Sequence, residues 1–151
     1  MIREVNSNKG AICAEILESL PNWFGMPESN AAYVRNVEAL PMFAAENSSR
    51  VEGFIALKRM TSFAFEIHVL GVRPELHRKG VGRALLLRAE EYVRATGVRY
   101  LTVKTLSASD PDPGYARTRA YYEAMGFLPI EEFGTLWNPE NPAVMMLKIV
   151  D

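Results

Sequence analysis

Residues 70–86 read LGVRPELHRKGVGRALL and contain the most informative pattern in the chain. An apolar strand is followed by a seven-residue loop, 73–79, and then by Gly80 and Gly82 at the start of a helical pattern. The first N–H groups of a helix have no partner within it, and glycines let an anion approach the backbone closely. The cations near this position are Arg73, Arg78, Lys79 and Arg83. The pattern therefore predicts a binding site for a ligand that carries phosphate groups.

Two common phosphate-binding motifs do not fit this segment. The nucleotide P-loop ends in Gly-Lys-Ser or Gly-Lys-Thr, and neither triplet occurs here. The dinucleotide fingerprint needs a third glycine where this chain has Leu85, and an acidic residue about 20 residues further on, which is missing. The phosphate site is therefore of another kind.

The segments on either side of residues 70–86 predict one α/β domain that spans residues 1–151. The helix at 80–96 is the clearest, because Val81, Leu85 and Ala89 lie on one apolar stripe. The other predicted helices are 11–20, 27–37 and 115–125, and the predicted strands are 2–5, 40–45, 51–58, 63–72, 100–106, 127–133 and 143–150. Three successive strands favour antiparallel hairpins, and the later strand–helix–strand segment favours a parallel pair, so we expect a mixed sheet.

The bulk composition is that of a soluble globular protein, with 48% hydrophobic and 23% charged residues. The net charge of -1 argues against broad binding to nucleic acid or to an anionic membrane. No stretch approaches the ~18 apolar residues of a membrane span, and the first residues lack a signal-peptide pattern, so we expect a cytoplasmic protein. Cys13 is the one cysteine, which excludes an internal disulfide and a cysteine zinc cluster. We expect it to be a buried helix residue.

Two segments resemble motifs of the GNAT superfamily of N-acetyltransferases. Residues 77–82, HRKGVG, are similar to the family's acetyl-CoA pyrophosphate loop: Gln or Arg, two residues, Gly, one residue, then Gly or Ala. His77 departs from the usual Gln or Arg. Residues 119–127, RAYYEAMGF, resemble the family's late motif of an aromatic residue, Tyr, three residues and Gly-Phe. Upstream of it, Tyr115 and Thr118 replace the usual Asn and small residue.

The resemblance implies a GNAT-like α/β (α+β) fold, with a mixed, mostly antiparallel sheet of about six to seven strands flanked by about four helices. It implies acetyl-CoA as co-substrate, no metal, and transfer of the acetyl group to a primary amine by direct attack in a ternary complex. The residues that would bind the cofactor are Leu70, Gly71, Val72, His77, Arg78, Lys79, Gly80, Val81, Gly82, Arg83 and Tyr122. Gly71 inside a strand suggests a β-bulge there. Dimers are common in the family, so a homodimer is a further expectation.

Amide formation from a thioester requires a neutral amine, a stabilised carbonyl oxygen and a proton for the departing thiolate. By resemblance, Tyr122 is the general acid, and the neighbouring Tyr121 is expected to point about 100° away around the helix. Glu66 and His68 lie two residues apart on one strand and so on one face. Glu66 is our first choice as base, because a carboxylate shielded from water holds a proton more readily. His68 is the second, because an imidazole pKa of ~6.5 suits proton shuttling.

Two alternatives remain for this pair: Glu66 pairs with a nearby cation, and His68 has a structural role only. The acceptor region is less defined. The residues Trp23, Phe24 and Tyr33 are candidates for an acceptor wall or for the core, and Glu28 or Glu46 would attract a cationic amine. The acidic turn at 110–114 and the loop at 137–139 are candidate rims. A small-molecule amine is the preferred acceptor; the alternatives are a protein N-terminus or lysine, or a non-catalytic CoA-binding regulator.

Overall fold

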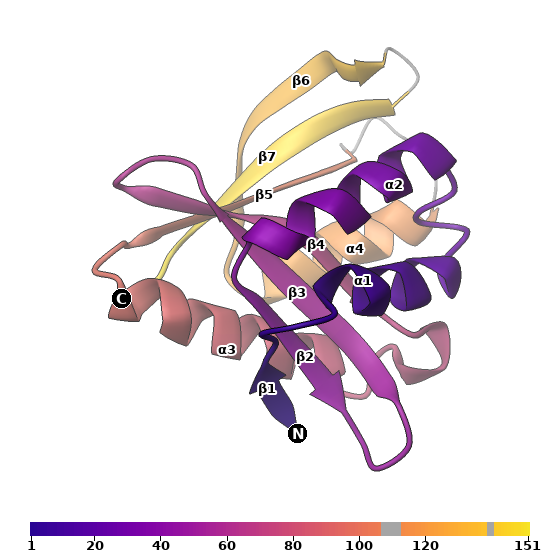
Figure 1. The fold of residues 1–151 in the computed structure, drawn as a ribbon. Helices are drawn as coiled ribbons and strands as arrows, with labels where there is room; N and C mark the ends of the chain where they lie inside the picture. The colour runs from indigo at the N-terminus through magenta and orange to yellow at the C-terminus, as the bar shows by residue number, and fades with distance from the viewer. Residues whose placement is uncertain (107–112, 139–140) are drawn as a thin grey trace.

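The computed structural model describes residues 1–106, 113–138 and 141–151, and a seven-stranded sheet runs through them (Figure 1). The strands are β1 (Ile2–Glu4), β2 (Met42–Glu46), β3 (Val51–Arg59), β4 (Ala64–Val72), β5 (Tyr100–Leu106), β6 (Leu128–Asn138) and β7 (Asn141–Ile149). The helices are α1 (Lys9–Glu18), α2 (Pro27–Asn36), α3 (Val81–Ala95) and α4 (Pro113–Ala124), with 3-10 turns at Val37–Ala39 and Pro74–Leu76.

The strand order is β1-β2-β3-β4-β5-β7-β6, in which β4 and β5 are parallel and every other neighbouring pair is antiparallel. The mixed, mostly antiparallel sheet predicted from the sequence is confirmed, and so is the order of the elements. The main difference is in β6, which continues past the predicted end at residue 133, because Asn138 still pairs with Asn141 of β7. Cross-strand pairing, rather than local propensity, decides where a strand ends.

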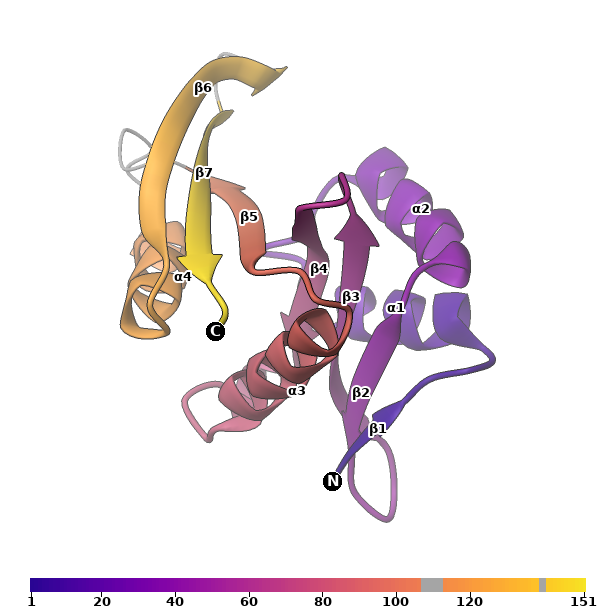
Figure 2. The same cartoon turned by 90° about the vertical axis from the view of Figure 1, so that its left-hand side faces the viewer.

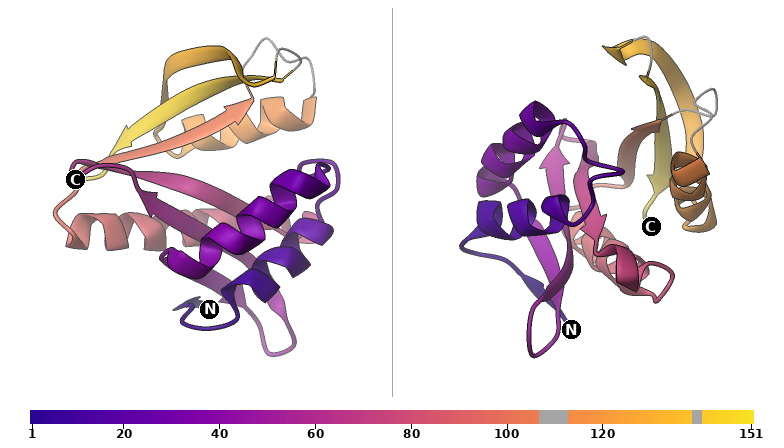
Figure 3. Two further views of the ribbon diagram at one scale, coloured as in Figure 1. Left: turned by 45° about the horizontal axis from the view of Figure 1, so that its top comes forward. Right: turned by 90° about the vertical axis from the view of Figure 1, so that its right-hand side faces the viewer.

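Alternate side chains of the central strands fill two apolar cores on opposite faces of the sheet. On β3, Phe54 packs in the core beneath α1, whereas Ile55 packs in the core beneath α3. This alternation is the direct consequence of the two-residue period of a strand. Cys13 lies fully buried in the α1 core, as expected. Figure 3 shows α1 and α2 on one side of the sheet and α3 on the other.

A β-bulge in β4 changes which residues face each core. Ala56 of β3 pairs with Val69, but the next residue, Leu57, pairs with Ile67, so that His68 is the extra residue. Ile67 therefore packs in the α3 core and Val69 in the α1 core, although two residues apart they would normally share a face. The bulge re-aims the second half of β4.

The prediction of a bulge at Gly71 is wrong. Gly71 pairs regularly with Phe54 of β3. A Cβ atom added at Gly71 would lie 2.9 Å from the Cγ2 atom of Ile16 on α1. Glycine is therefore needed here because α1 packs closely against β4, and the extra residue lies three positions earlier.

The sheet opens between its two parallel strands. Pairing between β4 and β5 runs from Ala64–Tyr100 to Ile67–Val103 and ends there. Figures 2 and 3 show β5, β6 and β7 turning away from the first four strands, together with α4. An ion pair also joins the two halves: Lys148 Nζ of β7 lies 3.0 Å from Oε2 of Glu90 on α3. None of the helices in the described ranges is long and apolar enough to cross a membrane.

Candidate active site

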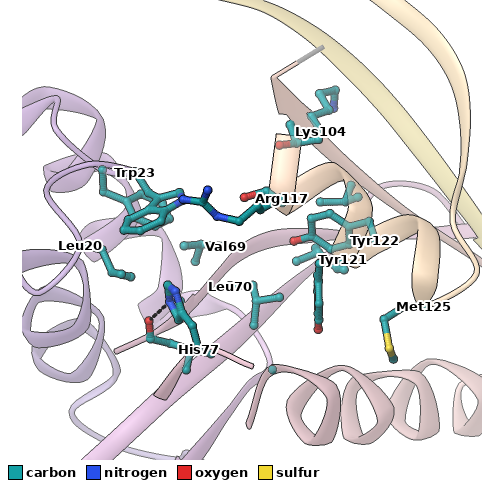
Figure 4. A pocket seen from close by; sticks show the side chains of 18 of the residues that line it. Leu20, Trp23, Val69, Leu70, His77, Lys104, Arg117, Tyr121, Tyr122 and Met125 are labelled. Carbon is teal, nitrogen blue, oxygen red and sulfur yellow. Dashed lines mark hydrogen bonds between the residues drawn. The ribbon is translucent and has the colours of Figure 1, made fainter. Parts of the chain in front are cut away.

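A cavity of about 1080 Å³ lies where the sheet opens, between β4, β5, the start of α3, α4 and the α1–α2 connection (Figure 4). The sequence-predicted residues that line it are Trp23, Phe24, Tyr33, Leu70, Gly71, Val72, His77, Arg78, Gly80, Gly82, Arg83 and Tyr122. Four other candidates, Lys79, Val81, Glu66 and His68, are not among its lining residues. The fold thus brings the predicted phosphate loop, late tyrosine and acceptor residues around one cavity.

The start of α3 presents backbone N–H groups at this cavity. Gly80 has a φ of 87°, in the left-handed region that glycine adopts without strain. The Ala84 N–H donates to the Gly80 carbonyl at 3.0 Å as the first bond of the helix, so the N–H groups of the three preceding residues remain available. No described side chain caps the helix, and its first turn has no acidic residue. This terminus is suited to an anion.

The cations around this terminus are fewer than the sequence suggested. Arg78 and Arg83 line the cavity. Arg73 instead donates to the Val51 carbonyl at 2.7 Å and forms an ion pair with Glu15 of α1 at 2.9 Å. The expectation that Arg73 serves the phosphate site is therefore wrong: it ties the end of β4 to α1.

The opening of the sheet leaves one edge of β4 without a neighbouring strand. The Arg73 N–H donates to Glu52 of β3 at 3.0 Å, so by alternation the N–H and C=O groups of Leu70 and Val72 point the other way, toward the cavity. The imidazole of His77 donates from Nε2 to the Val72 carbonyl at 2.8 Å. The centres of the His77 and Trp23 rings lie 5.3 Å apart in an edge-to-face contact. The remaining groups can pair with an extended amide-containing ligand, as an added strand would.

Tyr122 of α4, the candidate proton donor, lines the cavity. Its side chain is buried, and its ring packs 5.4 Å from the ring of Phe127. Burial raises the pKa of Tyr122 well above its usual range, with smaller contributions from Tyr121 and Tyr33. The phenol therefore keeps its proton at neutral pH.

Tyr121, the neighbour of Tyr122 on α4, points in a different direction from Tyr122 but still reaches the cavity (Figure 4). It lines the same cavity, with its ring centre 5.1 Å from that of Tyr122. A Cβ atom added at Gly82 would lie 3.3 Å from the Tyr121 hydroxyl oxygen. That hydroxyl is buried and has no hydrogen-bond partner among the described residues. Gly82 thus accommodates a helix–helix contact as well as leaving the start of α3 open.

The carboxylate of Glu66 is paired with a cationic side chain. Its carboxylate forms an ion pair with Lys104 of β5, and the two side chains are 14% and 26% exposed. Lys104 lines the cavity and Glu66 does not. The ion-pair alternative considered for Glu66 is therefore the arrangement present in the structure.

His68, the extra residue of the β4 bulge, contacts Tyr33 of α2. The centres of the His68 and Tyr33 rings lie 5.3 Å apart in an edge-to-face contact. The Nε2 atom of His68 is buried without a hydrogen-bond partner among the described residues. Burial lowers the pKa of His68, the charge of Lys58 lowers it further, and that of Glu66 opposes the shift. The imidazole is therefore neutral at neutral pH and can accept a proton. Tyr33 lines the cavity, whereas His68 does not.

Lys104 and Arg117 are lining residues that sequence reasoning missed. A lysine inside the apolar strand 100–106 is a signal that could have pointed to the first of them. The acidic candidates are not where they were expected: Glu46 pairs with Arg3 at 2.6 Å, and neither Glu46 nor Glu28 is a lining residue.

Residues 107–112 and 139–140, which contain most of the acidic turn and part of the last loop, lie outside the described residues, as does the side chain of Trp137. In the part of the chain that is described, no group of three or more His, Cys, Asp or Glu residues could hold a metal ion.

An uncapped glycine start of a helix, a free strand edge and a buried tyrosine around one cavity are the features of an acyl-CoA-dependent acetyltransferase. The family model described as "Acetyltransferase (GNAT) family" matches residues 12–127. The chain therefore belongs to the GNAT family of acetyltransferases. Solved structures that share its fold contain coenzyme A or acetyl-CoA.

Two characterised relatives share part of the sequence. One is the mycothiol acetyltransferase of Beutenbergia cavernae, 42% identical over 65 residues, which are 43% of this chain and 20% of that protein. The other is the N-alpha-acetyltransferase RimI of Mycobacterium tuberculosis, 36% identical over 75 residues, which are 50% of this chain and 42% of that protein. The match therefore spans well under half of each relative's length.

Several solved structures share the fold over the whole chain. A GNAT-family protein from Desulfovibrio desulfuricans has a TM-score of 0.85 at 20% identity and covers 100% of this chain and 99% of its own. An aminoglycoside 6'-N-acetyltransferase with coenzyme A has a TM-score of 0.80 at 18% identity, and the match covers 100% of this chain and 97% of that protein. The ribosomal-protein-S18-alanine N-acetyltransferase of Escherichia coli has a TM-score of 0.76 at 18% identity, and the match covers 100% of this chain and 95% of that protein. At these identities the likeness concerns the fold, which serves very different acceptors.

Proposed function

We propose that this protein transfers the acetyl group of acetyl-CoA to the primary amine of a small molecule, by direct attack of the amine in a ternary complex. The observation that carries the proposal is the meeting of the α3 start and Tyr122 in one cavity. At about 1080 Å³, that cavity has room for both the thioester arm and an acceptor.

The cofactor would lie along the surfaces that offer unpaired groups. Its phosphates fit the N–H groups at the start of α3, with Arg78 and Arg83 beside them. Its amide-containing arm fits the free edge of β4 at Leu70 and Val72. This path ends near Tyr122, which would protonate the sulfur as the C–S bond breaks.

A direct attack agrees with the position of the one cysteine. Cys13 is buried in the α1 core, on the opposite side of β3 and β4 from α3, and burial raises the pKa of its thiol to about 12. A protonated, inaccessible thiol cannot take up the acetyl group. The amine nitrogen would therefore form its bond to the carbonyl carbon directly, and it must lose a proton in doing so.

The residues proposed to receive that proton are His68 and Glu66. His68 is the chemically readier of the two, because its imidazole is neutral and its Nε2 atom has no partner among the described residues. Glu66 is held by Lys104. Since Tyr33 contacts His68 and lines the cavity, whereas His68 does not line it, the proton would travel through the Tyr33 hydroxyl or through water.

The test is release of free CoA thiol from acetyl-CoA in the presence of a panel of small primary amines and of peptides, with the acetylated product checked by mass spectrometry. Turnover with small amines is the expected result. Turnover with peptides alone would favour the alternative of a protein N-terminal or lysine acetyltransferase. Binding of CoA by calorimetry, with no turnover on any acceptor, would favour a non-catalytic CoA-binding regulator.

A further inference from the structure

The cavity has two ends with different tasks. At one end are the start of α3 and the cations Arg78 and Arg83, which suit the phosphates of the cofactor. The other end is formed by the α1–α2 connection, β5 and α4, and contributes Trp23, Lys104 and Arg117. On the proposed function, this second end receives the acceptor amine.

The charged lining residues at the acceptor end are cations. In the described part of the chain no Asp or Glu side chain lines the cavity at either end. The Lys104 charge is already balanced by Glu66. None of the ion pairs between described residues involves Arg117, so its guanidinium is the charge that the acceptor meets.

Arg117 and an aromatic wall bound this end together. Figure 4 shows the Arg117 side chain reaching from α4 toward Trp23, across the acceptor end of the cavity. Phe24 and Tyr33 continue the wall, with their rings 6.0 Å apart in an edge-to-face contact. Flat aromatic surfaces bind apolar or aromatic bodies, and a guanidinium binds a carboxylate through two parallel hydrogen bonds.

A polycationic acceptor does not suit the lining formed by the described residues. Binding several ammonium groups needs carboxylates in the wall, and like charges facing one another disfavour a complex. An acceptor with one amine and one carboxylate has the opposite property, because its carboxylate pairs with Arg117 while its amine approaches Tyr33 and Tyr122.

We infer that the acceptor is a small primary amine that carries a carboxylate on an apolar or aromatic body, and that Arg117 is the residue that selects the carboxylate. The inference rests on the proposed function and narrows it to one class of amine.

The experiment compares three acceptors with the same ring and the same aminomethyl group: aminomethylbenzoate, its uncharged amide and the corresponding bis(aminomethyl)benzene, each in meta and para forms. Their kcat/KM values are measured at saturating acetyl-CoA. The parent protein is expected to prefer the benzoate over the amide, and the amide over the diamine. Arg117→Glu should lower kcat/KM for the benzoate by at least about tenfold to a hundredfold, the value of one charge-assisted hydrogen bond, because it removes both hydrogen bonds to the carboxylate, and it should raise kcat/KM for the diamine.

Two further variants separate selection from damage. Arg117→Lys keeps the charge and should retain part of the preference for the benzoate. Arg35→Glu makes the same charge reversal on an exposed residue of α2 that does not line the cavity, and it should leave the order of the three acceptors unchanged. The KM for acetyl-CoA should stay the same in all of them.

A parent protein that acetylates the diamine as well as the benzoate would overturn the inference. So would an Arg117→Glu variant that loses activity equally on all three acceptors. Acetylation of other amines with no activity on any of the three also contradicts it, but leaves the acetyltransferase proposal standing. Failure to release thiol with any amine contradicts the proposed function itself.

Discussion

Glu66 of β4 and Lys104 of β5 form an ion pair where the two parallel strands begin to separate: Glu66 still pairs with Thr102, whereas Lys104 follows Val103, the last paired residue of β5. The pair connects a residue outside the cavity with one that lines it. It therefore links the candidate base to the acceptor end, and substitutions on its two sides have different expected effects.

Glu66→Gln tests the carboxylate as a base. If Glu66 takes the proton of the amine, kcat/KM should fall by about 10²–10⁴-fold at low pH, and the loss should shrink as pH approaches the amine pKa of ~10. The measurement is a pH profile of kcat/KM for the parent and the variant. Lys104→Met is the matched control, because it removes the cation and keeps the carboxylate. Equal, pH-independent losses in both variants would mean that Glu66 only positions Lys104.

Tyr122→Phe removes the proposed proton donor and keeps the ring packing against Phe127. We expect a loss of about 10²–10⁴-fold in kcat, because general acid catalysis is lost. Unfolding in urea should show a change of about 1 kcal/mol or less. Acetyl-CoA affinity should be nearly intact.

Tyr121→Phe is the companion variant. It removes a buried hydroxyl that has no partner among the described residues, so stability should stay equal or rise. Its effect on kcat should be much smaller than that of Tyr122→Phe. A parental rate in Tyr122→Phe would assign Tyr122 a packing role and leave protonation of the thiolate to water or another group.

Gly82→Asp tests the phosphate site at the start of α3. The added side chain both approaches the Tyr121 hydroxyl and places a negative charge beside the expected phosphates. Gly82→Asn adds the same bulk without the charge, so the difference between the two isolates repulsion, roughly 1–4 kcal/mol for charges about 4 Å apart. Calorimetry should therefore find acetyl-CoA bound at least about fivefold more weakly by Gly82→Asp than by Gly82→Asn. Equal affinities in two folded variants would place the phosphates elsewhere.

The lowered pKa of His68 predicts a pH effect on stability. The unfolded chain binds a proton at this imidazole as pH falls below 6.5, whereas the folded chain resists it because of burial and Lys58. The free energy of unfolding should therefore fall as pH drops below 6.5, until the folded imidazole is also protonated. Urea unfolding at pH 7.5 and 5.5 should show a smaller loss for His68→Gln than for the parent. An identical loss in both would mean that His68 is not perturbed by folding.

Glu90 and Lys148 offer a test of how the two halves of the sheet are joined. The Glu90 side chain is 5% exposed and that of Lys148 21%, and Arg94 lies 3.8 Å from the same carboxylate. Lys148→Met should lower the free energy of unfolding by about 1–3 kcal/mol, because it leaves a buried carboxylate with its weaker partner only. Arg99→Ala breaks the exposed pair with Asp151 and should cost about 1 kcal/mol or less. A similar loss in the free energy of unfolding for both variants would show that the burial of Glu90 does not strengthen its ion pair.

The sequence alone determined the features that depend on neighbouring residues. The glycines at 80 and 82, the apolar stripe of α3 and the tyrosine before Gly126 are local patterns, and each was found where it was predicted. The order of strands and helices also followed from local periodicity, because backbone conformation is decided within a few residues.

Only the tertiary structure decided the features that depend on a partner far along the chain. The bulge lies at His68 and not at the predicted Gly71, because pairing with β3 sets the register of β4. Arg73 does not line the phosphate site, because it forms an ion pair with Glu15 of α1. Glu66 forms an ion pair with Lys104, which lies 38 residues further along the chain. Arg117 lines the end of the cavity that we propose for the acceptor, because α4 packs on the far half of the opened sheet. A long side chain binds whichever group the fold brings within reach, and no local pattern contains that information.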